Sequence, residues 1–283
     1  MFLNQLKTVV LLGLLTGILL VIGGLIGGRA GLTIAFVFAI LMNFGMYFYS
    51  HKLVLVMYRA KPLSKKQAPK IHQMVEEIAK EAGIPKPKLY MVPTQTSNAF
   101  ATGPSPKKAV VAVTEGIVKL LTYDELKGVL AHEIGHVKNR DMLVSTIAAA
   151  LASVISYVAF MARWAAIFGG VGGRDRGGTN IVGLIVIGIL APIAALIIRL
   201  AISRSREYLA DSTGAKFLKN GVPLARALEK LESDNRSHPL RFGSPSTSSL
   251  FIVNPFRANT LVRLLSTHPP IPERAKRLRS MKF

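Results

Sequence analysis

Ala131-His132-Glu133-Ile134-Gly135-His136 lies near the middle of this 283-residue chain and constrains how the surrounding segments must be arranged. On a helix, residues four positions apart share one face, so the imidazoles of His132 and His136 converge. Two histidines in this geometry are typical zinc ligands, and Glu133 is placed to act as general base on a water at the metal. Chance produces this motif far less than once in such a chain; the alternative is a pair of surface histidines on an amphipathic helix.

The residues before the motif carry strong local signals for a helix. Thr122-Tyr123-Asp124-Glu125 has the pattern of a capping box, in which the first side chain and the fourth each satisfy a backbone N–H of the other. Apolar residues then recur at helical spacing. The pattern predicts a helix from near Thr122 to about Asp141, with the motif on it.

A catalytic zinc site needs a third protein ligand, because the fourth position is left to water. The segment from Ser205 to Asp211 supplies Glu207, with Asp211 four residues further on and therefore on the same helical face. We expect Glu207 to bind the metal and Asp211 to accept a hydrogen bond from the outer nitrogen of a ligand histidine. The alternative is a solvated, charged start of a helix.

Four segments without a charged side chain are each about as long as a bilayer crossing. They are Thr8–Gly28, Ala30–Ser50, Met142–Ala162 and Gly177–Ile198. Two spans between the motif and Glu207 return the chain to the same side of the membrane, as a shared metal requires. The sequence predicts a mainly α membrane protein with four transmembrane helices. The expected division is a hairpin at 1–50, a first domain half at 51–141, a second hairpin at 142–202 and a second domain half at 203–283.

The distribution of positive charge predicts the orientation of the chain in the membrane. One set of loops holds 13 Lys and Arg residues near the membrane and the opposite set holds 4. The positive-inside rule then places both termini and both metal-binding segments in the cytosol. The net charge of +21 fits an anionic inner leaflet, and no interleaved basic and aromatic motif points to nucleic acid. The absence of cysteine excludes disulfides and thiolate zinc ligands.

Short strand candidates between the first hairpin and the motif predict a small sheet in an otherwise helical domain. They are Lys88–Val92, Ser97–Thr102 and Ala109–Thr114, separated by turns that contain Pro or Gly. A protease can hold an extended substrate by strand addition to an exposed sheet edge, and 98–103 is the candidate edge. The alternative is a core strand in which Phe100 is buried.

The combined motifs resemble those of the HtpX-type membrane zinc metallopeptidases. The resemblance rests on the His132-Glu133-x-x-His136 motif, on Glu207 with Asp211, on Asn98-Ala99-Phe100-Ala101-Thr102-Gly103 and on Thr267-His268-Pro269-Pro270, and it covers almost the whole chain. It implies a zincin-like (gluzincin) α+β protease domain, one Zn²⁺ per chain, and polypeptide substrates that include misfolded membrane proteins under stress. It also implies that Asn98 and Ala99, with Phe100, lie beside the substrate. His268 is a candidate donor to the oxyanion of the tetrahedral intermediate.

Two other functions remain open on these residues. One is a site-specific processing peptidase, since relatives with these motifs trim prenylated proteins. The other is a membrane-anchored binding protein without hydrolysis, although a pure binder has no need of a base such as Glu133. Zinc is favoured by the ligand set, while cobalt or manganese can occupy a site of this kind.

Overall fold

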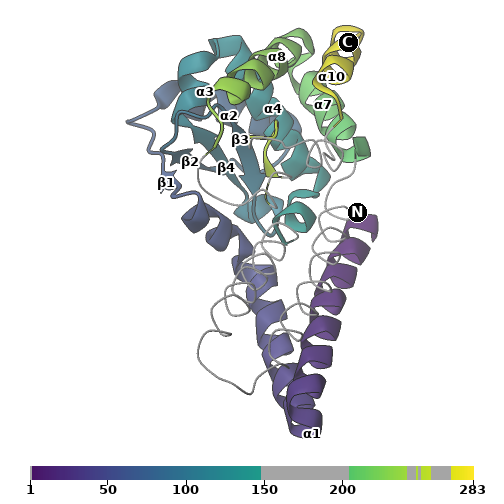
Figure 1. Cartoon of the computed structure of the whole chain (residues 1–283). Helices are drawn as coiled ribbons and strands as arrows, with labels where there is room; N and C mark the ends of the chain where they lie inside the picture. The colour runs from purple at the N-terminus through teal and green to yellow at the C-terminus, as the bar shows by residue number, and fades with distance from the viewer. Residues whose placement is uncertain (1, 148–203, 241–246, 248–249, 256–268) are drawn as a thin grey trace.

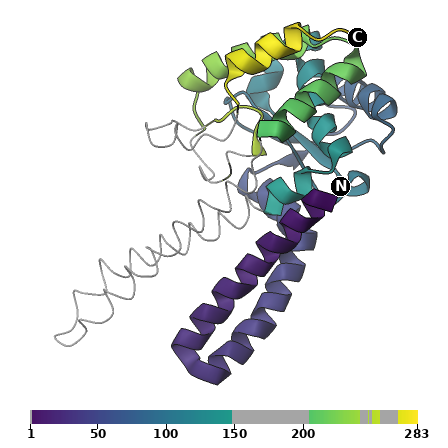
Figure 2. The same cartoon turned by 90° about the vertical axis from the view of Figure 1, so that its right-hand side faces the viewer.

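The computed structural model describes residues 2–147, 204–240, 247, 250–255 and 269–283 of the chain. Helices dominate, and a small mixed sheet lies among them (Figures 1 and 2). The helices are α1 (Phe2–Met57), α2 (Pro69–Ala82), α3 (Glu115–Leu120), α4 (Tyr123–Asn139), α7 (Arg204–Leu218), α8 (Val222–Ser237) and α10 (Ile271–Arg279), with a 3-10 turn at Pro106–Lys108. The strands are β1 (Lys61–Pro62), β2 (Lys88–Val92), β3 (Ala99–Thr102) and β4 (Val110–Thr114).

Helix α1 folds back on itself and projects from the rest of the molecule as a hairpin (Figures 1 and 2). The reversal coincides with Gly28, whose φ of 55° lies in the left-handed region that glycine adopts without a steric penalty. Asn43 donates a hydrogen bond of 2.8 Å to the Thr16 hydroxyl and so joins the two arms. Many large apolar side chains along α1 are exposed, including Ile34 and Leu41, as expected for a surface that faces lipid.

The membrane prediction is supported for one helix and not confirmed for four. Among the described residues, one helix, Gly28–Met57, is long and apolar enough to cross a membrane, and it contains the predicted span Ala30–Ser50. The predicted span Thr8–Gly28 contains a shorter apolar helix, Leu12–Val21. Residues 142–147 are helical, while the rest of the third span and the whole fourth span lie outside the described residues.

The sheet has the strand order β1-β2-β4-β3, so β3 is an edge strand. β2 pairs with β4 in parallel, and β3 pairs with β4 antiparallel with Phe100 opposite Ala112. The expected strand at 88–92 has the predicted bounds, and the other two differ from their predictions by one or two residues. The prediction of a small sheet is confirmed, and the candidate edge contains a true edge strand.

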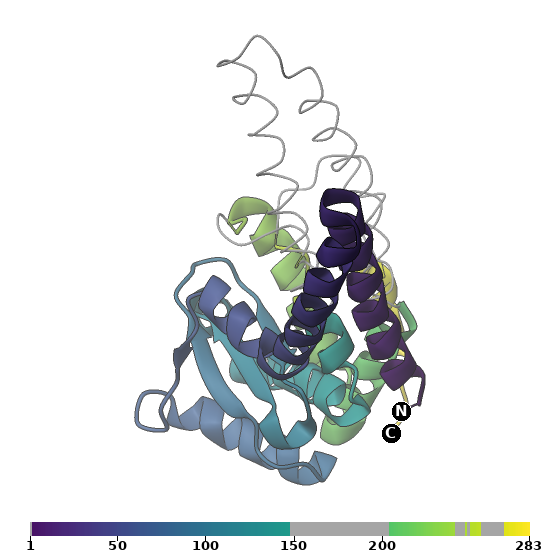
Figure 3. The ribbon, with the colours of Figure 1, turned by 90° about the horizontal axis from the view of Figure 1, so that it is seen from below.

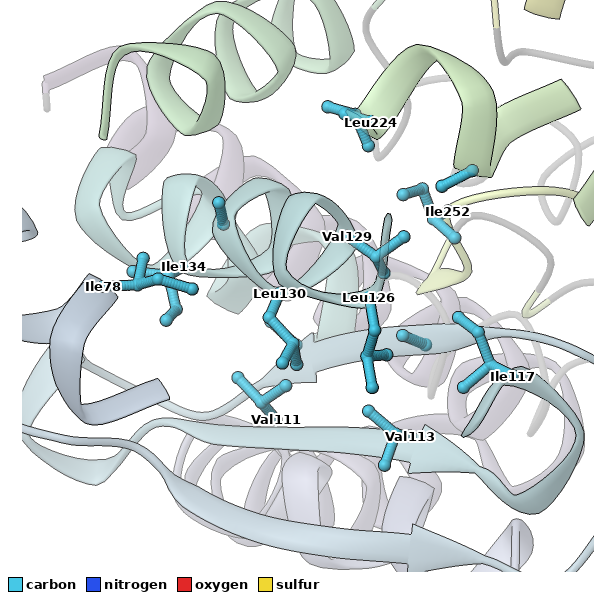
Figure 4. Packing of buried hydrophobic residues seen from close by; sticks show 14 of the residues in the cluster. Ile78, Val111, Val113, Ile117, Leu126, Val129, Leu130, Ile134, Leu224 and Ile252 are labelled. Carbon is cyan, nitrogen blue, oxygen red and sulfur yellow. The ribbon is translucent and has the colours of Figure 1, made fainter. Parts of the chain in front are cut away.

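One face of the sheet packs against α2 and α4, and this contact forms the main hydrophobic core. Leu126 and Leu130 of α4 meet Val113 and Val111 of β4, and Ile78 of α2 lies against Ile134 (Figure 4). Every residue of α4 from Gly128 to Gly135 is buried, so the middle of this helix is enclosed on all sides. The sheet thus supports the helix that carries the two histidines.

The opposite face of the sheet packs against the end of α1 and a segment from the second half of the chain. Tyr58, Phe100 and Phe251 form an aromatic cluster with ring centroids 5.0–5.8 Å apart. Val54 and Leu55 of α1 are buried in the same cluster. The hairpin therefore ends inside the core of the folded domain. Figure 3 shows the molecule from below, the side on which the hairpin projects.

Candidate active site

Helices α4 and α7 cross closely because each carries a glycine at the contact. A Cβ on Gly135 of α4 would lie 3.0 Å from the Ala210 carbonyl oxygen of α7. A Cβ on Gly214 of α7 would lie 2.7 Å from the backbone nitrogen of His132. A real Cβ essentially never lies within 3.0 Å of another non-bonded heavy atom, so a larger residue at Gly214 forces the helices apart. The close approach brings the carboxylates of α7 to the histidines of α4.

His132, His136 and Glu207 form a cluster whose candidate ligand atoms all lie within 4.8 Å of one another. The Nε2 atoms of the two histidines are 3.1 Å apart, and the rings are nearly perpendicular at 89°. Oε1 of Glu207 lies 3.6 Å from His136 Nε2, and Oε2 lies 3.8 Å from His132 Nε2. All three side chains point at one another from two helices.

The spacing of these atoms fits a tetrahedral zinc ion. Ligand atoms at about 2.0–2.1 Å from a tetrahedral ion lie about 3.3–3.4 Å from one another. The observed separations of 3.1, 3.6 and 3.8 Å bracket that value. Two imidazole nitrogens and one carboxylate are also the donor set of a catalytic zinc site with one open position.

Each histidine is held by a second carboxylate at its outer nitrogen. His132 Nδ1 lies 2.9 Å from Asp211 Oδ1, and His136 Nδ1 lies 3.1 Å from both carboxylate oxygens of Asp141. Such contacts fix the orientation of a ligand histidine and direct its other nitrogen to the metal. Burial lowers the pKa of His132; burial also acts to lower the pKa of His136, but Asp141 and Glu207 raise it to about 10.

A buried arginine, Arg274 of α10, completes the support of His132. Its guanidinium binds both carboxylate oxygens of Asp211, at 2.8 and 2.7 Å, and is fully buried. Burial raises the pKa of Asp211, but Arg274 outweighs that effect and lowers it to about 2. Arg274 also donates to the Ile252 carbonyl at 3.0 Å and lies 3.5 Å from Glu207.

Glu133 lies beside the cluster with its side chain buried. Burial raises its pKa to about 8, and Glu207 adds to this effect. The backbone N–H of Ala101 in β3 donates to the Glu133 carboxylate and opposes it. A carboxyl group whose pKa lies near neutrality can accept and return a proton, which is what general acid–base catalysis requires.

A cavity of about 20 Å³ lies between the cluster and the residues around it, large enough for about one water molecule. Its walls include Glu133, His136 and Glu207, with the guanidinium of Arg206 and apolar side chains of 250–252. Arg206 is 9% exposed, and its Nη1 is buried without a hydrogen-bond partner within the part of the chain that the structure describes. Burial lowers the pKa of Arg206, which is one of the residues that line the cavity.

The structure places the predicted site residues in two groups. Glu133, His132, His136, Glu207 and Asp211 come together around the cavity.

Of the other predicted site residues, those that the structure describes do not belong to this group around the cavity. Asn98 and Ala99 lie at the edge strand, and Phe100 is fully buried in the aromatic cluster, as the alternative interpretation predicted. His268 lies outside the described residues.

Three charged residues of the site were missed by the sequence analysis. Asp141 follows His136 by five residues, and the left-handed conformation of Arg140 turns the chain back so that the carboxylate reaches the ring. That signal was available, since an acidic residue just after the helix is a natural partner for a ligand histidine. Arg206 precedes Glu207 directly, while Arg274 is one of several basic residues in its helix and carries no local mark.

Comparisons with known proteins agree on one family. Residues 65–282 match the model of peptidase family M48. A protein of Syntrophobacter fumaroxidans is 55% identical over 283 residues, covering 98% of this chain and 99% of its own. One of Pyrococcus furiosus is 54% identical over 275 residues, covering 97% and 95%. Both are named Protease HtpX homolog.

A solved structure, Ste24p of S. mikatae, resembles this chain in fold. The TM-score is 0.51 at 20% sequence identity, and the match covers 97% of this chain. It covers 65% of the Ste24p chain, so this chain spans about two thirds of that structure. The likeness extends the agreement from sequence to the arrangement of helices and sheet.

Proposed function

We propose that this chain, which belongs to peptidase family M48 and is a metallopeptidase, is a membrane-embedded zinc endopeptidase with one zinc ion per chain. The observation that carries the proposal is the cluster of His132, His136 and Glu207 beside the buried carboxyl of Glu133. Asp211 and Asp141 support it, because they hold the outer nitrogens of both histidines.

The proposed reaction is hydrolysis of a peptide bond by water. A zinc ion held by the three ligands would supply Lewis acidity at the open position of the cluster. Glu133 takes the proton from the attacking water and passes it to the leaving amine. Arg206 lines the same cavity, and its Nη1, which has no hydrogen-bond partner among the described residues, donates to the carbonyl oxygen as that oxygen gains negative charge. His268 is a second candidate for this donor role.

The membrane arrangement that we propose follows the sequence pattern. A hairpin at 1–50 anchors the chain in the cytoplasmic membrane, a second one at 142–202 interrupts the protease domain, and both domain halves lie in the cytosol. The exposed apolar side chains of α1 and the excess of Lys and Arg in the loops on one side support this arrangement. The basic domain then lies against an anionic inner leaflet.

The proposed substrates are extended polypeptides, including misfolded or damaged membrane proteins that are cleared under stress. An extended chain suits the edge strand β3, where Asn98 and Ala99 lie beside the cavity wall formed by Ala101. The site lies close to the membrane, since Tyr58, directly after the end of α1, is buried in the same domain. Substrates that are themselves in the membrane are therefore within reach.

The test is hydrolysis of unfolded casein by the detergent-purified, zinc-loaded chain beside its Glu133→Gln variant. We expect the variant to keep its zinc and to lose activity by about 10²–10⁴-fold, because the proton acceptor is gone. Glu81→Gln, an exposed change on α2, is the matched control and should leave activity unchanged. Zinc is counted by atomic absorption in all three proteins.

The outcomes separate the proposal from its alternatives. Equal activity of parent and Glu133→Gln protein would refute the mechanism. Bound zinc without hydrolysis by any form would favour a binding protein. Cleavage of protein substrates at one defined position would favour a processing peptidase over general clearance.

A further inference from the structure

The outer edge of β3 carries main-chain groups that an added strand would use. The Thr114 N–H donates to the Asn98 carbonyl at 3.0 Å, and Asn98 and Thr114 are directly opposite in the register. In an antiparallel pair such residues alternate with residues whose N–H and C=O point away. The main-chain groups of Ala99 and Ala101 therefore point to the outer edge, where the Ala99 N–H donates to Asn98 Oδ1 at 3.1 Å and the Ala101 N–H donates to Glu133.

Residues of the same chain already lie along this edge. The N–H of Ile252 donates to the Ala99 carbonyl at 3.4 Å. The Asn98 side-chain amide forms two hydrogen bonds with Val253, the residue after Ile252. It donates to the Val253 carbonyl at 2.6 Å and accepts from the Val253 N–H at 3.5 Å. Arg274 donates to the Ile252 carbonyl. We call residues 250–253 the edge segment.

The side chains of the edge segment alternate as those of a strand added to the sheet would. Phe251 packs on the α1 side of the sheet against Phe100, with ring centroids 5.4 Å apart. Ile252 packs on the opposite side, in the core that contains Ala99 and α4 (Figure 4). The edge segment is thus in register with β3 although it forms one main-chain hydrogen bond to it.

The edge segment also forms a wall of the cavity beside the candidate metal site. Leu250, Phe251 and Ile252 line this cavity together with Glu133 and His136. The remaining space holds about one water molecule and is far too small for a peptide backbone. A substrate that pairs with Ala99 and Ala101 therefore has to take the place of these residues.

We infer that residues Leu250-Phe251-Ile252-Val253 occupy the position of an extended substrate along β3, and that an apolar polypeptide displaces them to reach Glu133. The inference rests on the proposed function, since it names what the proposed peptidase binds at its edge strand. On displacement, the contacts of the edge segment with β3 are replaced by similar contacts of the substrate, because an extended substrate offers the same main-chain groups and similar apolar side chains. Access to the site is then limited to chains that expose apolar, extended segments, as unfolded proteins do.

The lack of cysteine in the native chain allows a direct test by a reversible cross-link. The Ile252 nitrogen and the Ala99 carbonyl oxygen are 3.4 Å apart, which places the two residues within reach of a disulfide. In the Ala99→Cys/Ile252→Cys double variant, we expect oxidation to lower casein hydrolysis at least about tenfold, because the open form is no longer populated. Reduction should restore the activity. The two single variants are matched controls and should not respond to oxidation.

A second measurement does not depend on turnover. Glu133→Gln protein, which retains the substrate edge, is mixed with a peptide of the sequence Leu-Phe-Ile-Val with blocked ends, and amide hydrogen exchange is followed. We expect residues 250–253 to exchange faster when the peptide is bound, because they have left the edge. A control peptide, Leu-Pro-Ile-Pro, lacks two amide hydrogens and should have a weaker effect.

The outcomes distinguish this inference from the proposed function. If the reduced double variant hydrolyses casein and the oxidised form is equally active, the inference is overturned while the proposed function stands. Slower exchange of residues 250–253 with peptide bound would also overturn it, since the edge segment would then be a fixed wall that the substrate covers. If no zinc-loaded form hydrolyses casein, the proposed function fails and the inference fails with it.

Discussion

The two sides of the cavity are held in very different ways. On the metal side, α4 and α7 meet at glycines, and Arg274 binds Asp211 through two charge-assisted bonds of 2.7 and 2.8 Å. On the substrate side, the edge segment meets β3 through one main-chain bond of 3.4 Å and the amide of Asn98. Charged hydrogen bonds are about twice as strong as neutral ones, so the metal side is the fixed side.

This difference suits a hydrolytic site. Metal ligands and their supports have to keep their geometry through each turnover, whereas a surface that receives a polypeptide has to exchange one chain for another. Arg274 contacts both sides, through Asp211 and through the Ile252 carbonyl.

The largest effect is expected at Arg274, because its removal breaks contacts on both sides of the cavity, with Asp211 and with the Ile252 carbonyl. Arg274→Met leaves the buried carboxylate of Asp211 without its cation, which costs about 3–5 kcal/mol of unfolding free energy. We expect a lower melting temperature in detergent and loss of zinc at equilibrium. Arg279→Met, on the same helix as Arg274, removes an exposed pair with Glu229 of α8 and should leave both quantities unchanged. Equal melting of the two variants would contradict the view of a fixed metal side.

A smaller effect is expected where α4 and α7 touch. Gly214→Ala places a Cβ 2.7 Å from the His132 nitrogen, so the helices must separate. Overpacking of this kind costs about 1–3 kcal/mol and moves Glu207 away from the histidines. Zinc content and thermal stability report the change. Gly13→Ala, where a Cβ meets nothing within 4 Å, is the control. A variant with full zinc content would show that the close approach is not needed.

The next smaller effect is expected at Asp141, which contacts the outer nitrogen of His136. Asp141→Asn keeps the shape of the side chain but removes the negative charge that faces Nδ1. We expect zinc affinity to fall about 10–100-fold, as for other partners of ligand histidines. Competition with a chelator measures the affinity. Asp124→Asn, in the exposed first turn of α4, should leave it unchanged, and an unchanged affinity in the Asp141 variant would remove Asp141 from the site.

The smallest effect is expected at the far end of α4, away from both sides. Burial acts to raise the pKa of Glu125, but hydrogen bonds from Lys230 and Thr122 outweigh it, so the folded pKa lies below the unfolded value of 4.5. Its charge therefore stabilises the fold above pH 4.5 and stops doing so as the pH falls through the folded pKa.

The matching variant is Glu125→Gln, which keeps the cap but loses the charge. It should lose about 1 kcal/mol at pH 7 and progressively less toward pH 3. Melting temperatures across this pH range measure the loss, with zinc content unchanged throughout. A loss that is independent of pH would show that the charge is not involved.

The parts of the molecule that sequence reasoning predicted depend on local signals. The capping box of Thr122 and Glu125 is present, and α4 covers 123–139 where 122–141 was expected. The four-residue spacings of His132 with His136 and of Glu207 with Asp211 place each pair on one helix face.

What sequence reasoning could not predict depends on contacts between distant residues. Arg274 meets Asp211 across 63 positions, and Asn98 meets Val253 across 155. Nothing in the residues around Arg274 distinguishes a buried guanidinium from the exposed ones nearby, because its burial depends on how α10 packs. The edge of the sheet was predicted, but its occupant was not, since one main-chain contact leaves no pattern in the sequence.

The contact between Arg274 and Asp211 also sets an order of events during biosynthesis. Arg274 follows His132 by 142 residues, so the ribosome makes it last among the charged residues described at the site. At about 5–20 residues per second, the delay between the two is on the order of 10 s. Until Arg274 arrives, Asp211 has no cation and His132 has no firm support. The support of His132 by Asp211 and Arg274 is therefore completed only when the last helix, α10, has been synthesised.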